Sequence, residues 1–73
     1  MTPRNRQVLA AIAALQQRNG YAPTVREIGD AVGLASSSTV HAHIGRLRRL
    51  GLVEHGSLPR TLRLTEAGRR ELG

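Results

Sequence analysis

The order Thr-Val-Arg-Glu-Ile-Gly-Asp-Ala-Val-Gly-Leu-Ala-Ser-Ser-Ser-Thr-Val-His-Ala-His-Ile-Gly-Arg-Leu-Arg-Arg occupies residues 24–49 and predicts two helices separated by a tight turn. Thr24 and Glu27 match a capping box, in which each side chain binds the backbone N–H of the other residue at a helix start. The apolar residues at helical spacing, which we expect to face inward, are Val25, Ile28 and Val32. Gly33 is expected to end this short helix in the left-handed conformation that glycine readily adopts.

The second helix of this pair is expected over about residues 37–50, closing at Gly51. Leu34 is the apolar residue of the turn, and Ser36 or Ser37 is expected to cap the helix. Two helices at a fixed angle, with small hydroxyl residues opening the second, are typical of motifs that place a helix N-terminus in a DNA major groove.

A further helix is predicted ahead of this pair. Thr2 and Pro3 favour its start, because threonine caps helices and proline fits the first helical position. Gly20 is expected to end it. Its buried stripe is expected to contain Val8, Ile12 and Leu15, with Leu9 and Ala11 beside them.

The segment after the three helices predicts a β-hairpin and a last short helix. Residues 52–55 and 61–64 alternate like strands, and residues 56–60 are expected to join them. The last helix is expected from Thr65 to Leu72, although the glycine inside it weakens this prediction. We therefore expect one domain over residues 1–73, mainly α with a small β-hairpin: a three-helix winged helix-turn-helix whose wing spans about residues 52–64.

The charge balance favours a polyanionic partner. The 73 residues contain eleven arginines, no lysine and five acidic residues, for a net charge of +6. Such an excess on a small body is typical of proteins that bind duplex DNA, although all-arginine usage is also what a GC-rich genome produces. Tyr21 is the only aromatic residue, which argues against single-stranded nucleic acid, whose bases stack on aromatic side chains. No cysteine is present, which excludes disulfides and cysteine-based metal sites.

The apolar run at residues 8–15 follows two arginines and could be mistaken for a secretion signal. It is too short to span a bilayer, and polar residues 16–18 follow where a small-residue cleavage site would be needed. We therefore expect a cytoplasmic protein with no membrane partner.

The third helix carries the most informative surface. Its buried stripe is expected to contain Val40, Ile44 and Leu47. The opposite face holds Ser38, Ala42, Gly45 and Arg49, flanked by Thr39 and Arg46 on one edge and by His41 and Arg48 on the other. Small side chains let a helix backbone approach base edges, where serine and threonine pair with any base, alanine meets a thymine methyl, and arginine or histidine donates to guanine. Small residues on a helix can instead pack against a neighbouring helix, which remains the alternative for Ala42 and Gly45.

These patterns predict a DNA-binding site without catalytic chemistry. The residues expected to contact bases are Ser38, Thr39, His41 and Ala42. The residues expected to contact the DNA backbone are Ser36, Ser37, Arg26, Arg46, Arg49, Arg60 and Arg63. His41 and His43 point to different helix faces, and no cysteine or nearby acid completes a metal set. His43 lies beside the buried stripe of the third helix and is therefore expected to pack. No catalytic constellation or cofactor motif is present, and we expect no enzyme activity, cofactor or metal.

Two segments resemble the N-terminal DNA-binding domain of the LexA family of SOS-response repressors. They are Gly-Tyr-Ala-Pro-Thr-Val-Arg-Glu-Ile at residues 20–28 and Gly-Leu-Ala-Ser-Ser-Ser-Thr-Val-His-Ala-His at residues 33–43. Gly51-Leu52-Val53 and Pro59-Arg60 also match the family's wing, so the likeness covers residues 4–64. The resemblance implies a repressor of the DNA-damage response on the bacterial nucleoid, reading an inverted-repeat operator with GAAC-type half-sites. It places the four base-contacting residues named above where the family reads bases.

Two features depart from the family. Ala22 stands where a second proline is usual, and the chain ends at Gly73, before the linker and the self-cleaving Ser-Lys peptidase domain that also dimerises these repressors. These residues contain no lysine and cannot form a Ser-Lys dyad. We expect the isolated DNA-binding domain of a longer repressor, monomeric alone and pairing on DNA, with a natural stand-alone relative as the alternative.

Two other functions fit a winged helix-turn-helix. One is a protein-interaction module, which needs no basic excess and uses large apolar anchors that the exposed face of the third helix lacks. The other is architectural DNA binding without sequence preference, against which the small polar face argues.

Overall fold

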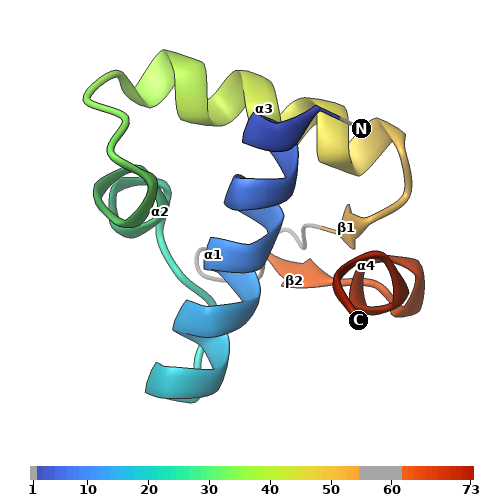
Figure 1. Ribbon diagram of the computed structural model, residues 1–73. Helices are drawn as coiled ribbons and strands as arrows, with labels where there is room; N and C mark the ends of the chain where they lie inside the picture. Colours follow the sequence, from blue (N-terminus) through green and yellow to red (C-terminus); the bar gives the residue numbers. More distant parts are fainter. Residues whose placement is uncertain (1, 55–61) are drawn as a thin grey trace.

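The computed structural model describes residues 2–54 and 62–73. Its elements in chain order are α1 (Pro3–Asn19), α2 (Val25–Val32), α3 (Ser37–Arg49), β1 (Val53–Glu54), β2 (Arg63–Leu64) and α4 (Glu66–Leu72). Helix α1 runs through the middle, with α3 across its N-terminal end, α2 on one side, and the strands and α4 on the other (Figure 1). The described residues therefore confirm the mainly helical winged helix-turn-helix.

The starts of α1 and α2 follow the capping rules read from the sequence, and the start of α3 does not. Thr2 Oγ1 accepts from the backbone N–H of Asn5 at 3.1 Å. The box at α2 is complete, because Thr24 Oγ1 accepts from Glu27 N at 3.1 Å and Glu27 Oε1 accepts from Thr24 N at 2.8 Å. Ser36 occupies the N-cap position of α3, but its side chain makes no capping hydrogen bond. The predicted position of the cap is thus confirmed, but the predicted capping hydrogen bond is absent. Ser36 is exposed at the start of α3.

One hydrophobic core joins every helix to the strands. The fully buried apolar residues of α1 are Val8, Leu9 and Ile12, whereas Leu15 is only partly buried. The observed buried stripe of α1 is therefore rotated slightly from the predicted one: it includes Leu9, and Leu15 lies at its edge. The cause is the central position of α1, which packs against α2, α3, β2 and α4, so its buried face is wider than that of a surface helix. Of the predicted inward residues of α2, Ile28 is fully buried while Val25 and Val32 are half-buried.

The wing strands are antiparallel, with Val53 opposite Leu64 and Glu54 opposite Arg63. They are shorter than the predicted strands over 52–55 and 61–64. Leu52 lies outside the ladder because its N–H donates to Leu47 O at the end of α3, at 3.0 Å. The alternation is confirmed where it is described, since Leu62 and Leu64 are buried and Arg63 is exposed. The predicted connecting loop at residues 56–60 lies outside the described residues.

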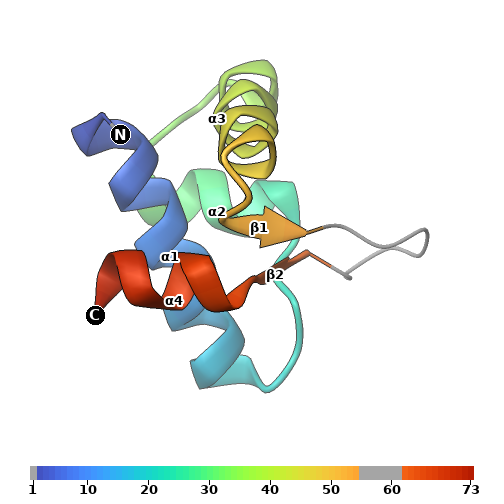
Figure 2. The same ribbon diagram turned by 90° about the vertical axis from the view of Figure 1, so that its right-hand side faces the viewer.

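Thr65 connects the end of α3 to the start of α4. Its hydroxyl donates to Gly51 O at 2.6 Å, and the same oxygen accepts from Gly68 N at 3.1 Å as the cap of α4. Its backbone N–H donates to Leu52 O at 3.0 Å. The bonds to Gly51 and Leu52 tie the start of α4 to the segment between α3 and β1, and α4 packs against α1 and β2 (Figure 2).

Gly68, which weakened the prediction of α4, is required by this close approach. A Cβ at this buried position would lie 2.1 Å from Leu52 O and 3.3 Å from the side chain of Leu64. We expect Gly68→Ala to lower the free energy of unfolding by about 1–3 kcal/mol, the usual cost of overpacking, as measured by urea denaturation. The control is Ala67→Gly, at an exposed position of the same helix. It should lower the free energy of unfolding by no more than about 1 kcal/mol, the usual cost of replacing alanine by glycine in an exposed helix interior. An unchanged stability for Gly68→Ala would contradict this packing.

Candidate nucleic-acid interface

Helix α3 presents the predicted face to solvent. Val40 and Leu47 are 1% and 0% exposed, and Ile44 is 8% exposed, so the buried stripe is confirmed. The residues from Ser36 to Thr39, together with His41 and Ala42, are exposed. Both ribbon views place α3 at one edge of the molecule, with its outer side clear of the other described elements (Figures 1 and 2). The four predicted base-contacting side chains therefore share an accessible surface.

The alternative that Ala42 and Gly45 pack against a neighbouring helix is not supported. Ala42 is exposed. Gly45 is half-buried, yet a Cβ added there would meet nothing within 4 Å. The fold of the described residues thus gives no steric reason for a glycine in the middle of α3.

Gly45→Ala is therefore expected to stabilise the domain. Alanine favours a helix interior over glycine by about 0.5–1 kcal/mol, which corresponds to a rise in Tm of about 2–8 °C for a domain of this size. Thermal denaturation followed by circular dichroism measures the shift. Gly33→Ala is the matched control: its Cβ would also meet nothing, but its φ of 75° strains any L side chain, so its Tm should fall. A fall in the Tm of both variants would contradict the open space beside Gly45.

The residues of α2 and α3 that were predicted to contact the DNA backbone lie near the two ends of α3. Arg46 and Arg49, with Arg48, are exposed in its last turn. At the other end, Arg26 from α2 shares a groove of about 560 Å³ with Ser37 and His41. Asp30 lines the same groove and was not singled out from the sequence. A carboxylate repels phosphate, so an anion in this groove is disfavoured near Asp30.

Arg63 on the wing has an ion-pair partner that the sequence did not reveal. The Nε of Arg63 donates to Glu54 Oε1 across the strand pair at 2.5 Å, and both side chains are more than half exposed. The sequence analysis named no partner for Arg63, because the register that places Glu54 opposite it is not visible in the sequence. Exposed ion pairs of this kind are worth at most about 1 kcal/mol, so a phosphate can compete for the guanidinium. Arg60 lies outside the described residues.

Sequence reasoning missed a buried polar contact behind α3. Asn5 is 2% exposed, and its Oδ1 lies 2.5 Å from Nδ1 of His43. His43 is half-buried, in agreement with its predicted packing role. A signal was present, because residues 5, 8, 9 and 12 share one helix face, which places Asn5 on the stripe of Val8, Leu9 and Ile12.

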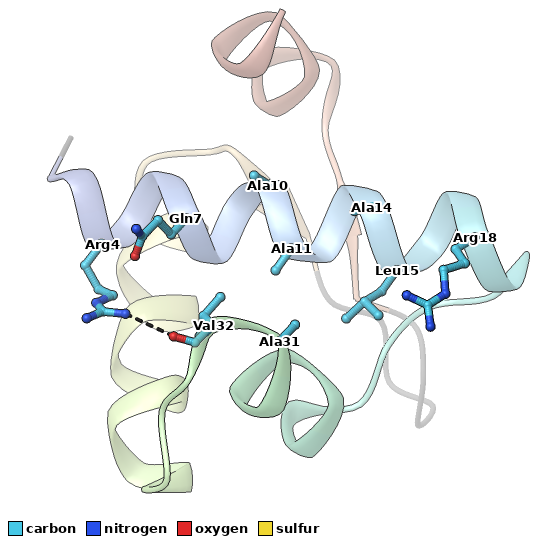
Figure 3. A pocket seen from close by; sticks show the side chains of 9 residues that line it. All are labelled: Arg4, Gln7, Ala10, Ala11, Ala14, Leu15, Arg18, Ala31 and Val32. Atoms are coloured by element: carbon cyan, nitrogen blue, oxygen red, sulfur yellow. Dashed lines mark hydrogen bonds between the residues drawn. The ribbon is translucent and has the colours of Figure 1, made fainter.

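A second groove, between α1 and α2, offers no reactive chemistry. It has a volume of about 580 Å³, and its lining consists of Arg4, Gln7, Ala10, Ala11, Ala14, Leu15, Arg18, Ala31 and Val32 (Figure 3). None of these side chains is a carboxylate, a hydroxyl or an imidazole. Within residues 2–54 and 62–73 no three His, Cys, Asp or Glu residues are grouped as a metal site would require. In the same residues, no helix has the length and apolar character needed to cross a membrane.

Comparison with known proteins identifies a matching family and several relatives of this chain. The family model described as the LexA DNA binding domain matches residues 1–61. The LexA repressor of Oenococcus oeni is 52% identical over 67 residues, which cover 90% of this chain and 32% of that protein. The LexA repressor of Leuconostoc mesenteroides is 53% identical over 70 residues (92% and 33%), and that of Lactobacillus acidophilus is 47% identical over 68 residues (92% and 33%). The chain therefore spans about a third of the length of these relatives. The family model covers most of the chain, and these relatives match it over nearly its whole length, so the chain belongs to the LexA DNA-binding domain family.

Proposed function

We propose that this chain is the operator-reading domain of a transcriptional repressor of the DNA-damage response, and that it binds double-stranded DNA sequence-specifically by placing α3 in the major groove. The observation that carries the proposal is the outward face of α3, where residues 36–39, 41 and 42 are exposed on the side opposite a buried apolar stripe. The names of the relatives support the repressor function.

The proposed base contacts are made by Ser38, Thr39, His41 and Ala42. Short side chains at the N-terminal half of α3 allow its backbone to approach base edges, where hydroxyl, imidazole and methyl groups discriminate between base pairs. The net charge of +6 supplies the sequence-independent part of the affinity.

The proposed backbone contacts surround these residues. Ser36 and Ser37 begin α3 and are exposed, and the hydroxyl of Ser36 is not used in capping. Arg26, Arg46 and Arg49 are exposed cations of α2 and α3, and Arg63 is an exposed cation of β2. Arg60, on the wing sequence, completes the proposed set. Each phosphate contact contributes about 0.9 to the slope of log affinity against log salt.

The proposed operator is an inverted repeat, with GAAC-type half-sites and one copy of the domain on each. We propose that residues 1–73 form a single domain that is monomeric in solution and pairs on DNA. Pairing through a further domain of a longer repressor would raise affinity by making the second contact intramolecular. No catalytic role is proposed for these residues.

Selection of bound duplexes from a random pool tests the proposal directly. Recovery of one recurring half-site, with scrambled duplexes bound at least about tenfold more weakly at the same salt concentration, is the expected result. Binding of all duplexes with equal affinity would instead favour architectural binding. Absence of binding at low salt would favour a protein-interaction module.

A further inference from the structure

The first turn of α1 holds both helices of the helix-turn-helix through consecutive residues. Arg4 Nη1 donates to the carbonyl oxygen of Val32 at the end of α2, at 3.1 Å (Figure 3). The next residue, Asn5, contacts His43 in the middle of α3. The turn is itself fixed by Thr2, whose hydroxyl accepts from Asn5 N and whose carbonyl accepts from Arg6 N.

The contact between Asn5 and His43 differs in kind from the other anchors of α3. Val40, Ile44 and Leu47 are apolar, and apolar packing is not directional, so it tolerates small rotations of a helix. A hydrogen bond weakens steeply when its angle changes. Asn5 is the buried polar residue among those described, and no buried side-chain nitrogen or oxygen among them lacks a partner. A rotation of α3 that broke this bond would leave a buried amide oxygen unpaired.

The bond also constrains the tautomer of His43. The amide oxygen of Asn5 can only accept, so this hydrogen bond requires the hydrogen on Nδ1 of His43. In the neutral ring, Nε2 is then an acceptor. The orientation and hydrogen-bonding pattern of this imidazole are thus set from α1, outside the recognition helix.

We propose that Asn5 is a positioning residue for sequence readout: its bond to His43 fixes the rotation of α3, so that Ser38, Thr39, His41 and Ala42 meet base edges in one register. The inference rests on the proposed function of α3. Buried polar contacts often contribute structural uniqueness more than stability, because an apolar pair of the same shape can be equally stable. Loss of the bond should therefore reduce sequence preference while leaving phosphate contacts in place.

The test compares Asn5→Leu with Asn5→Asp, which keeps an acceptor oxygen at the same reach. Dissociation constants are measured for the selected half-site duplex and for a scrambled duplex at one salt concentration. For Asn5→Leu we expect the preference to fall about tenfold or more, the effect of losing one good base contact, with the scrambled duplex bound about as before. Asn5→Asp should retain the preference. Ile12→Val, a core change that leaves the bond intact, should lower the Tm and keep the preference.

Retention of the full preference by Asn5→Leu would overturn the inference, as would an equal loss in Ile12→Val. If Asn5→Leu does not fold, nitrogen-15 NMR of the wild-type imidazoles decides: a neutral His43 protonated on Nε2 alone would contradict the bond. The proposed function fails separately, because in that case the wild-type domain itself shows no preference between the two duplexes.

Discussion

Leu47→Ala is expected to lower the free energy of unfolding by about 2–5 kcal/mol, the range for truncating a buried leucine. Leu47 is 0% exposed and lies on the buried stripe of α3, within the core cluster that joins α1 to the wing. Its carbonyl also receives the Leu52 N–H that begins the wing. A domain of 73 residues has a total stability of only about 4–11 kcal/mol, so this substitution should remove a large fraction of it and lower the Tm markedly.

Urea denaturation of Leu47→Ala and Leu50→Ala provides the measurement and its control. Both substitutions remove the same atoms near the end of α3, but Leu50 is 53% exposed. Leu50→Ala should therefore change stability by no more than about 0.5 kcal/mol. Similar losses in the two variants would contradict the burial of one and the exposure of the other.

The second large effect concerns the two classes of DNA contact. His41→Ala and Ser38→Ala should each weaken binding to the selected half-site by about 1–3 kcal/mol and relax base preference at one position. Arg49→Ala should instead weaken binding to all duplexes by a similar factor, and should reduce the salt slope by about one. The physical reason is position: Ser38 and His41 lie in the N-terminal half of α3, whereas Arg49 is its last residue.

Salt titrations on selected and scrambled duplexes separate these classes. Arg69→Ala is the matched control for lost charge, because Arg69 is exposed on α4. Helix α4 lies away from the outer side of α3 (Figure 2). Its salt slope should stay close to that of the wild type. If His41→Ala and Arg49→Ala changed the slope equally and left base preference intact, the proposed division of α3 into base and phosphate contacts would be wrong.

Features that depend on neighbours in the sequence could be predicted. The capping box at Thr24, the left-handed Gly33 and the buried stripe of α3 are set by residues within a few positions of one another. For this reason the orientation of α3, and with it the candidate base-contacting face, could be assigned before any contact between elements was known.

Features that depend on contacts between elements could not be predicted. Gly68 looks unfavourable in a helix until the carbonyl of Leu52 is placed against it. Arg63 looks unpaired until the strand register brings Glu54 opposite. The buried amide of Asn5 acquires a partner only when the first turn of α1 meets the middle of α3.

Thr65 has a mechanical consequence that reaches the end of the recognition helix. One hydroxyl bonds the carbonyl after α3 and the first turn of α4 at once. Local opening of α4 therefore withdraws a partner from Gly51, and fraying at Gly51 releases α4. Opening of α4 is therefore coupled to the end of α3, whose last turn carries Arg46, Arg48 and Arg49.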